Sequence, residues 1–303
     1  MKPALHTVSY AGVWPGQARL ELDEIIPRAA DLGYAGLMLM AKRPHASVLD
    51  MTPKRREQVR ALLERHRVGV ACLAGYNDFT MGAGRLDIPT REMQIHFITE
   101  LARLAADLSA PAVRVFTGFS RSEVPFQTQW NWVVDALREC AKRAAEHDVI
   151  IGVQNHHDIA SHWQLMRDLI DEVGEPNCRA MFDAWTPALH GDDLAEAVKG
   201  MGERIVHTTV ADYVRRPRYD YLPELVNFAR RDDAVRMVAP GEGFIDYAAF
   251  FGALAQVGYD GYVGCEICAP LRGGGHLENL DACAKKFVSF LAHHTGQAGR
   301  VEP

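Results

Sequence analysis

Short runs of apolar and β-branched residues alternate with longer amphipathic stretches along almost the whole chain of 303 residues. This alternation is typical of βα units, in which a helix follows each strand and the strands form a parallel sheet. The predicted strands are Leu5–Tyr10, Gly36–Met40, Val68–Leu73, Ala112–Phe116, Val149–Asn155, Ala180–Asp183, Ile205–Val210 and Tyr262–Ile267. Eight is the number of strands that closes an α/β barrel. The sequence therefore predicts one (β/α)₈ barrel.

Helical patterns fill the intervals between these strands. The predicted helices are Leu20–Leu32, Pro53–His66, Arg91–Leu108, Trp130–His147, Trp163–Val173, Leu194–Gly200, Tyr247–Val257 and Leu277–His293. Thr52 followed by Pro53 is a good N-terminal signal, because threonine caps a helix and proline suits its first turn. No linker interrupts the rhythm, so we expect a single TIM barrel domain over residues 1–294. A mobile C-terminal tail is expected at residues 295–303.

The composition excludes several classes of protein. The hydrophobic fraction of 48% and the charged fraction of 24% are those of a soluble globular protein. A net charge of -6 argues against a nucleic-acid surface. The first residues, MKPALHTVSY, show neither a secretory signal nor a membrane span. We expect a cytoplasmic protein with a small-molecule partner, and a homo-oligomer is compatible with the sequence.

Six cysteines spread over a long chain favour reduced thiols over a disulfide framework. Cys265 and Cys268 form a CxxC pair, but no second pair exists to complete a zinc site, and this pair begins inside a predicted strand. A redox or metal role is therefore disfavoured for it.

Polar residues end several predicted strands, where the active site of an α/β barrel forms. They are Gln154, Asn155, His156, His157 and Asp158 after VIIGV, Asp183 after RAMF, His207 and Thr209 within IVHTTV, and Glu266 within YVGCEIC. Residues two apart on a strand share a face, so Gln154 and His156 project together, as do His207 and Thr209. Carboxylate, imidazole and amide ligands suit Mn²⁺, Mg²⁺, Co²⁺ or Zn²⁺. The pattern indicates a divalent-metal site at this end of the barrel.

Structural roles are the alternative for each of these residues. Asp183 or Glu266 would then be a buried carboxylate paired with an arginine, and Gln154 a hydrogen-bonded core amide. Strand parity favours a site role for His156. His6 and Arg114, on the first and fourth strands, are weaker candidates, with Arg114 a candidate substrate ligand.

The late part of the chain carries Gly241-Glu242-Gly243-Phe244-Ile245-Asp246, followed by Gly258-Tyr259-Asp260-Gly261 and Glu266. With these motifs, and over nearly its whole length, the chain resembles the sugar-phosphate isomerase/epimerase (xylose-isomerase-like) superfamily. The resemblance implies a metal held by a Glu on strand five, an Asp on strand six, a His on strand seven and a Glu on strand eight. Asp183 and Glu266 match the family residue types.

Two positions depart from the family pattern. The strand-five motif Glu-Asn-His reads Gln154-Asn155-His156 here, so a neutral amide replaces a carboxylate. On strand seven the family histidine corresponds to Thr209, and the nearest imidazole is His207, two residues earlier. We expect His207 to substitute from deeper in the barrel, which gives the predicted ligand set Gln154, Asp183, His207 and Glu266, with Mn²⁺ the preferred ion.

The resemblance also implies a substrate class, which is a keto sugar or related polyol. The expected reaction is isomerisation or epimerisation through an enediolate, with Glu266 as base and His156 as an acid/base or hydroxyl-binding group. His157, Arg114, Arg215 and Arg272 are candidate substrate ligands, the last beside a glycine-rich turn that suits an anion.

Two other functions remain open. A lyase or dehydratase would use the same enolate to expel a leaving group, and loss of one carboxylate at Gln154 favours this over two-base epimerisation. A sugar-binding barrel without catalysis is the third reading, which metal content would separate from both enzymes.

Overall fold

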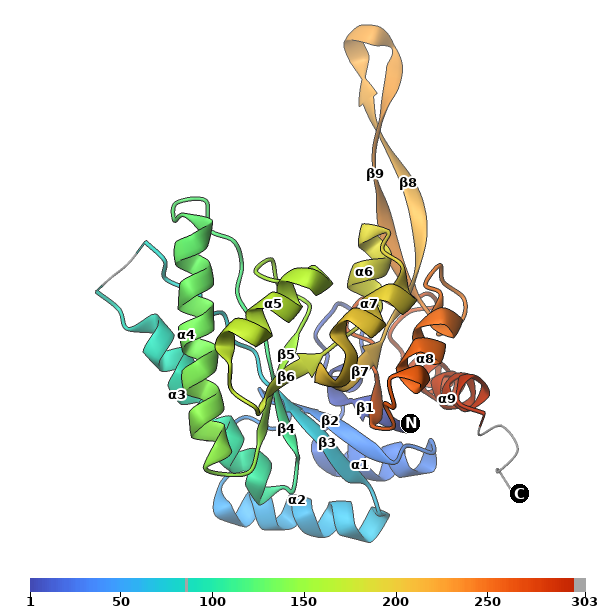
Figure 1. Ribbon diagram of the computed structural model, residues 1–303. Helices are drawn as coiled ribbons and strands as arrows, with labels where there is room; N and C mark the ends of the chain where they lie inside the picture. Colours follow the sequence, from blue (N-terminus) through green and yellow to red (C-terminus); the bar gives the residue numbers. More distant parts are fainter. Residues whose placement is uncertain (85–86, 297–303) are drawn as a thin grey trace.

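The computed structural model describes residues 1–84 and 87–296, and its core is a closed barrel of eight parallel strands in the order β1-β10-β7-β6-β5-β4-β3-β2 (Figure 1). The barrel strands are β1 Lys2–His6, β2 Gly36–Met40, β3 Gly69–Ala74, β4 Ala112–Val115, β5 Ile150–Gln154, β6 Cys178–Met181, β7 Ile205–Val210 and β10 Tyr262–Cys265. The predicted (β/α)₈ TIM barrel is confirmed. The carboxyl ends of these strands define the end of the barrel where an active site is expected.

Helices surround the barrel, as Figure 1 shows. They are α1 Leu22–Asp31, α2 Pro53–His66, α3 Thr90–Asp107, α4 Phe126–Ala145, α5 Trp163–Val173, α6 Trp185–His190, α7 Leu194–Met201, α8 Tyr247–Gln256 and α9 Leu277–His294. Each presents apolar residues to the outside of the strands, and together they form the main hydrophobic core. A second, smaller hydrophobic cluster includes Met38, Cys72 and Met181.

Most sequence-based boundaries are close, but α6 was not predicted and α4 begins at Phe126 rather than at Trp130. The first strand also differs. Residues Thr7–Tyr10 were predicted as strand, but they form a short 3₁₀ helix, and β1 begins earlier, at Lys2. The backbone pairs Lys2 with Tyr262 and Pro3 with Val263, so the strand starts almost at the first residue. Thr52 caps α2 through Arg55 N, as predicted.

A long antiparallel hairpin, β8 Asp212–Leu222 and β9 Asn227–Val238, projects away from the barrel (Figure 1) and was not predicted. A 3₁₀ turn at Pro223–Leu225 joins its strands. Most of its side chains are exposed, and no clear alternation of apolar and polar residues marks it in the sequence. Neither a strand nor a helix was predicted for this segment after the seventh barrel strand.

A buried carboxylate anchors the base of this hairpin. Asp212, at the start of β8, accepts hydrogen bonds from the backbone N–H groups of Gly241 and Gly243 at 2.9 and 2.8 Å. A Cβ atom on Gly243 would lie 1.9 Å from Asp212 Oδ1, so only glycine fits at this close approach. This contact gives a structural role to the Gly-Glu-Gly part of the late motif.

We expect that shortening the hairpin leaves the stability of the barrel almost unchanged. Arg216 and Ala234 are opposite each other, so residues 217–233 can be replaced by an Asn-Gly turn. Because a two-stranded hairpin is at best marginally stable alone, the free energy of unfolding in urea should change by less than about 1 kcal/mol. Asp212→Ala, which removes the buried anchor, should cost more. A loss of several kcal/mol in the shortened variant would show that the outer hairpin supports the barrel.

Among the described residues, no helix is long and apolar enough to cross a membrane. The predicted tail falls, from residue 297 onward, outside the described residues, and α9 ends at His294.

Candidate active site

A cavity of about 440 Å³ lies at the carboxyl ends of the barrel strands. Its walls come from segments that follow or end β1, β2, β3, β4, β5 and β10. Four predicted site residues line it, namely Arg114, His156, His157 and Glu266. Aromatic and aliphatic side chains make up much of the remaining wall, including Tyr76, Phe116, Phe119, Val8 and Val13. A few charged groups among apolar walls are typical of a small-molecule site.

Glu266 follows directly after β10, and its backbone N–H donates to Val210 O at 3.1 Å. Its side chain is 11% exposed, and His6 Nε2 lies 4.0 Å from its Oε1. Burial raises the pKa of Glu266, while the positive charge of Arg114 partly opposes that rise. A carboxylate in this state is a better base than one in water.

Asp183 is fully buried, two residues after the end of β6. Its Oδ1 accepts the Thr209 backbone N–H at 2.6 Å, and its Oδ2 accepts a hydrogen bond from the Gln154 side-chain amide. Asn155 and the Asp183 backbone exchange two further hydrogen bonds, of 3.0 and 2.8 Å. Burial and the nearby charge of Glu266 raise the pKa of Asp183 to about 7.

Arg114, on β4, brings a positive charge into the barrel. Its side chain is 1% exposed, and its Nη1 donates to Gln154 Oε1 at 2.9 Å while Nη2 donates to Gly75 O at 2.8 Å. The guanidinium lies 4.0 Å from the Phe116 ring centre and 4.8 Å from that of Tyr76. Both ends of the Gln154 amide are thus committed, one to Arg114 and the other to Asp183.

His207 and Thr209, both on β7, have different surroundings. His207 is buried, its Nε2 has no hydrogen-bond partner among the described residues, and burial together with Arg114 lowers its pKa to about 3. Thr209, in contrast, contacts the acidic pair: its backbone N–H donates to Asp183 Oδ1 at 2.6 Å, and its side chain lowers the pKa of both Asp183 and Glu266. The position next to the two carboxylates therefore belongs to a hydroxyl.

His156 and His157 follow β5 and pack among aromatic rings. The two Nδ1 atoms are 3.0 Å apart. His157 stacks between Phe116 and Phe119, with ring centres 4.1 Å from each. Burial lowers the pKa of His156 to about 3 and that of His157 to about 4, so both rings are neutral at physiological pH. A neutral imidazole both donates and accepts hydrogen bonds.

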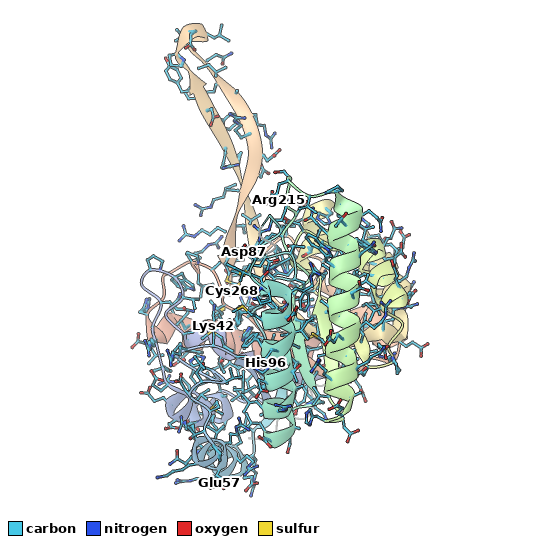
Figure 2. The ribbon with its side chains drawn as sticks, turned by 90° about the vertical axis from the view of Figure 1, so that its left-hand side faces the viewer. Lys42, Glu57, Asp87, His96, Arg215 and Cys268 are labelled. Atoms are coloured by element: carbon cyan, nitrogen blue, oxygen red, sulfur yellow. The ribbon has the colours of Figure 1, made fainter. Side chains whose placement is uncertain are left out.

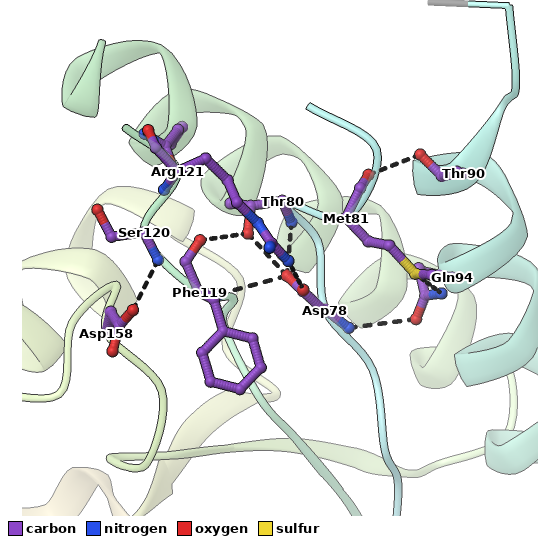
Figure 3. A network of polar contacts seen from close by, with 10 residues as sticks. Asp78, Thr80, Met81, Thr90, Gln94, Phe119, Ser120, Arg121 and Asp158 are labelled. Atoms are coloured by element: carbon purple, nitrogen blue, oxygen red, sulfur yellow. Dashed lines mark hydrogen bonds and ion pairs between the residues drawn. The ribbon is translucent and has the colours of Figure 1, made fainter. Parts of the chain in front are cut away.

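A polar network holds the loop that carries Phe119 (Figure 3). Asp78 Oδ1 accepts from the Thr80 backbone and hydroxyl at 3.0 and 2.7 Å and from the Phe119 backbone at 3.3 Å. Asp78 Oδ2 accepts from Arg121 at 2.5 Å. The carboxylate thus joins the segments after β3 and β4 and keeps Phe119 against His157.

We expect Asp78→Ala to destabilise the protein by about 1–3 kcal/mol, because several donors lose one shared acceptor. Urea unfolding checks this. Asp158→Ala is the matched control, since Asp158 accepts from the same loop only at Ser120 N, at 2.8 Å, and should cost less. Equal losses in the two variants would contradict the central role of Asp78.

Two predicted substrate ligands do not line the cavity. Arg215 is exposed near the base of the hairpin, where its guanidinium lies 4.2 Å from the Phe244 ring centre (Figure 2). Arg272 is half exposed and lies 3.5 Å from Glu242. Neither Arg215 nor Arg272 is part of the cavity wall.

Sequence reasoning missed several residues of the pocket, among them the polar residues Lys42 and Tyr76. Lys42 Nζ lies 3.9 Å from the centre of the Tyr76 ring, and burial and Arg114 lower the pKa of Lys42. Both residues come two positions after a strand, β2 and β3 respectively. The strand-end rule that selected Asp183 would therefore have found them. Figure 2 labels Lys42 and Cys268, another residue of the pocket wall.

The CxxC cysteines are free thiols, and burial raises the pKa of both Cys265 and Cys268, so neither is a reactive thiolate.

The residues present do not form the metal shell predicted from the resemblance. Asp183, His207 and Glu266 fail to bring three ligand atoms within 4.8 Å of one another, since over residues 1–84 and 87–296 only His162, His190 and Asp192 do so. Gln154 Oε1 is the atom that would bind a metal ion. It already accepts a hydrogen bond from the positively charged guanidinium of Arg114. Thr209 stands at the family histidine position, and His207 Nε2 makes no hydrogen bond to either carboxylate among the described residues.

The cluster of His162, His190 and Asp192 lies apart from these residues, at the start of α5 and the end of α6. His162 Nε2 is 3.4 Å from Asp192 Oδ2, but its Nδ1 accepts from Gln164 N and caps α5. A metal bound to His162 Nε2 would favour a proton on Nδ1. A protonated Nδ1 could no longer accept the hydrogen bond from Gln164 N that caps α5.

Comparisons with known proteins agree with this architecture. Fructoselysine 3-epimerase of Escherichia coli O157:H7 is 20% identical over 260 residues, covering 83% of this chain and 87% of that protein. Inosose dehydratase of Geobacillus thermodenitrificans is 23% identical over 147 residues, covering 48% of this chain and 49% of that protein. The crystal structure of D-psicose 3-epimerase from Clostridium cellulolyticum H10 has a TM-score of 0.75 at 18% identity and covers 97% of this chain and 99% of that chain. Residues 26–286 match the sequence profile of the xylose isomerase-like TIM barrel, and the chain belongs to that family.

Proposed function

We propose that this protein is an enzyme that removes a proton next to the carbonyl group of a keto sugar or related polyol and so isomerises or epimerises it. One observation carries the proposal, which is that Glu266 lies with raised pKa in an apolar cavity that also contains the buried guanidinium of Arg114. Relatives that are sugar epimerases and an inosose dehydratase support the substrate class.

The proposed reaction moves one proton to Glu266 and places one negative charge on the carbonyl oxygen of the substrate. The Glu266 carboxylate takes the proton from the carbon beside the carbonyl. The electron pair of that C–H bond forms a C=C bond to the carbonyl carbon, and the π pair of the C=O bond moves to the oxygen, which becomes an enolate oxygen. Return of a proton to the opposite face of the same carbon gives an epimer. Return to the former carbonyl carbon, with transfer of a hydroxyl proton, gives an isomer.

His156 is the group best suited to pass the second proton. It lines the cavity with Glu266 and is neutral because its pKa is lowered to about 3. One ring nitrogen can therefore donate a proton while the other accepts one. Gln154 cannot share this task, since an amide is not a base at neutral pH and both of its ends are hydrogen-bonded.

A lyase is the second candidate, and a specific observation favours it. Gln154 stands where the family has a carboxylate, so the site lacks a second strong base for symmetrical epimerisation. The same enolate would then expel a hydroxyl or other leaving group from the next carbon.

Product analysis separates these functions. The protein is incubated with a panel of ketohexoses, ketopentoses and inososes, and the products are identified by mass spectrometry and NMR. An isomerase or epimerase gives a product of unchanged mass, whereas a dehydratase gives one that has lost water. Binding of these compounds without any product would indicate the non-catalytic sugar-binding barrel.

A further inference from the structure

Arg114 is a buried positive charge without a carboxylate partner. It is 1% exposed, and the part of the chain that the structure describes places no Asp or Glu oxygen within 4.0 Å of it as an ion pair. Its partners are two neutral oxygens, Gln154 Oε1 and Gly75 O. Burying an unpaired charge costs free energy, so such a group is ready to accept an anion that enters the same cavity.

The guanidinium also has hydrogen-bond donors to spare. Of its five N–H groups, one on Nη1 and one on Nη2 are used, and Nε has no partner among the described residues. The rings of Phe116 and Tyr76 lie against the guanidinium and limit its movement. Arg114 is part of the cavity wall, so the unused N–H groups on Nη1 and Nη2 are the donors for a bound substrate, whereas Nε is itself buried.

The charge balance of the site matches this role. The family pattern implied by the resemblance has three carboxylates around an ion of charge +2, which sums to -1. This chain has Asp183 and Glu266 beside one arginine, which is two negative charges and one positive charge when both carboxyl groups are ionised, and then also sums to -1. Gln154, the residue that lost the carboxylate, is the residue to which Arg114 is hydrogen-bonded.

We propose that Arg114 supplies the permanent positive charge that a divalent metal supplies in the family pattern, so that proton abstraction by this protein needs no metal ion. The inference deepens the proposed function and rests on it. Free N–H groups of Arg114 bind the carbonyl oxygen of the substrate and stabilise the negative charge that develops there as Glu266 takes the proton. Gln154 positions the guanidinium and links it to Asp183, while Thr209 fills the space next to the carboxylates.

Manganese binding tests the metal claim without any substrate. The wild-type protein is dialysed against a chelator and titrated with Mn²⁺, and free Mn²⁺ is measured by electron paramagnetic resonance. We expect no site whose occupancy depends on Asp183 or Glu266. His190→Ala serves as a control, because it removes any binding at the surface cluster of His162, His190 and Asp192. About one Mn²⁺ per chain that persists in His190→Ala and disappears in Asp183→Asn would overturn the proposal.

Exchange of the substrate proton with deuterated water tests the role of the arginine. Exchange by the wild type should continue at the same rate in excess chelator. Arg114→Met should lower it about 10²- to 10³-fold, Arg114→Lys should retain part of it, and free guanidinium ion should restore part of the rate in Arg114→Met. Circular dichroism shows whether each variant is folded. Loss of exchange with chelator and its recovery with Mn²⁺ would contradict the proposal.

Failure of the proposed function and failure of the Arg114 role give different experimental results. If the wild type exchanges the proton of no compound in the panel, the proposed function is wrong, and the Mn²⁺ titration still decides whether the barrel holds a metal. If exchange occurs but requires a metal, the proposed function stands and the role of Arg114 is wrong.

Discussion

Glu266→Gln should lower the rate of substrate proton exchange by about 10²–10⁴-fold, the usual contribution of a general base. The amide keeps the size of the side chain and its place in the cavity wall, but it cannot accept the proton. Exchange is measured by NMR in deuterated buffer, and product formation should fall by the same factor.

Glu242→Gln is the matched control for this substitution. Glu242 lies on the surface, where it pairs with Lys286 at 2.6 Å and with Arg272 at 3.5 Å. Its loss should leave exchange unchanged. If Glu266→Gln retained the wild-type rate, the base would be another group, with His156 the first to examine.

Asp183 should destabilise the folded protein increasingly as the pH rises from 5 to 8. Its pKa rises from 3.8 to about 7 on folding, so the folded state holds a proton that the unfolded state has released in this range. This contribution is fully favourable below pH 3.8 and is lost as the pH passes 7. Relative to Asp183→Asn, which does not titrate, the wild type should lose roughly 2–3 kcal/mol between pH 5 and pH 8.

The difference between the two proteins is the quantity to measure, by urea unfolding at each pH. Buried histidines such as His156 and His207 have lowered pKa values, and their contribution to stability increases with pH over an overlapping range. They are common to both proteins and cancel in the difference. A difference that does not change with pH would mean that Asp183 is ionised across the whole range.

The barrel could be predicted because its physical signal is local and repeated. Each strand is a short apolar run, such as Gly36–Met40, buried on both faces by the barrel interior and the surrounding helices. The hairpin β8–β9 carries no such signal. Its residues, including Arg215, Arg218 and Asp220, are exposed and polar, so they have the composition of a loop although they pair as strands.

The candidate site was predicted in part. Strand-end position identified Glu266, Arg114, His156 and His157, which line one cavity, and Asp183 behind it. The contact between Arg114 and Gln154 joins residues 40 positions apart, and no local pattern in one sequence indicates it. The choice between His207 and Thr209 depended on depth along β7, which strand parity leaves open because both residues share a face.

Solvent deuterium in the product tests the central claim, proton removal by a carboxylate, most directly. The wild type is incubated in deuterated buffer with the compound from the panel that it converts, and the product is examined by mass spectrometry and NMR. We predict one deuterium at the carbon next to the carbonyl for an epimerase, one deuterium at the former carbonyl carbon for an isomerase, and deuterium in recovered substrate for a lyase. Complete conversion to a product of unchanged mass with no deuterium in substrate or product would indicate that the hydrogen is transferred without exchange with solvent, and would contradict proton abstraction by Glu266.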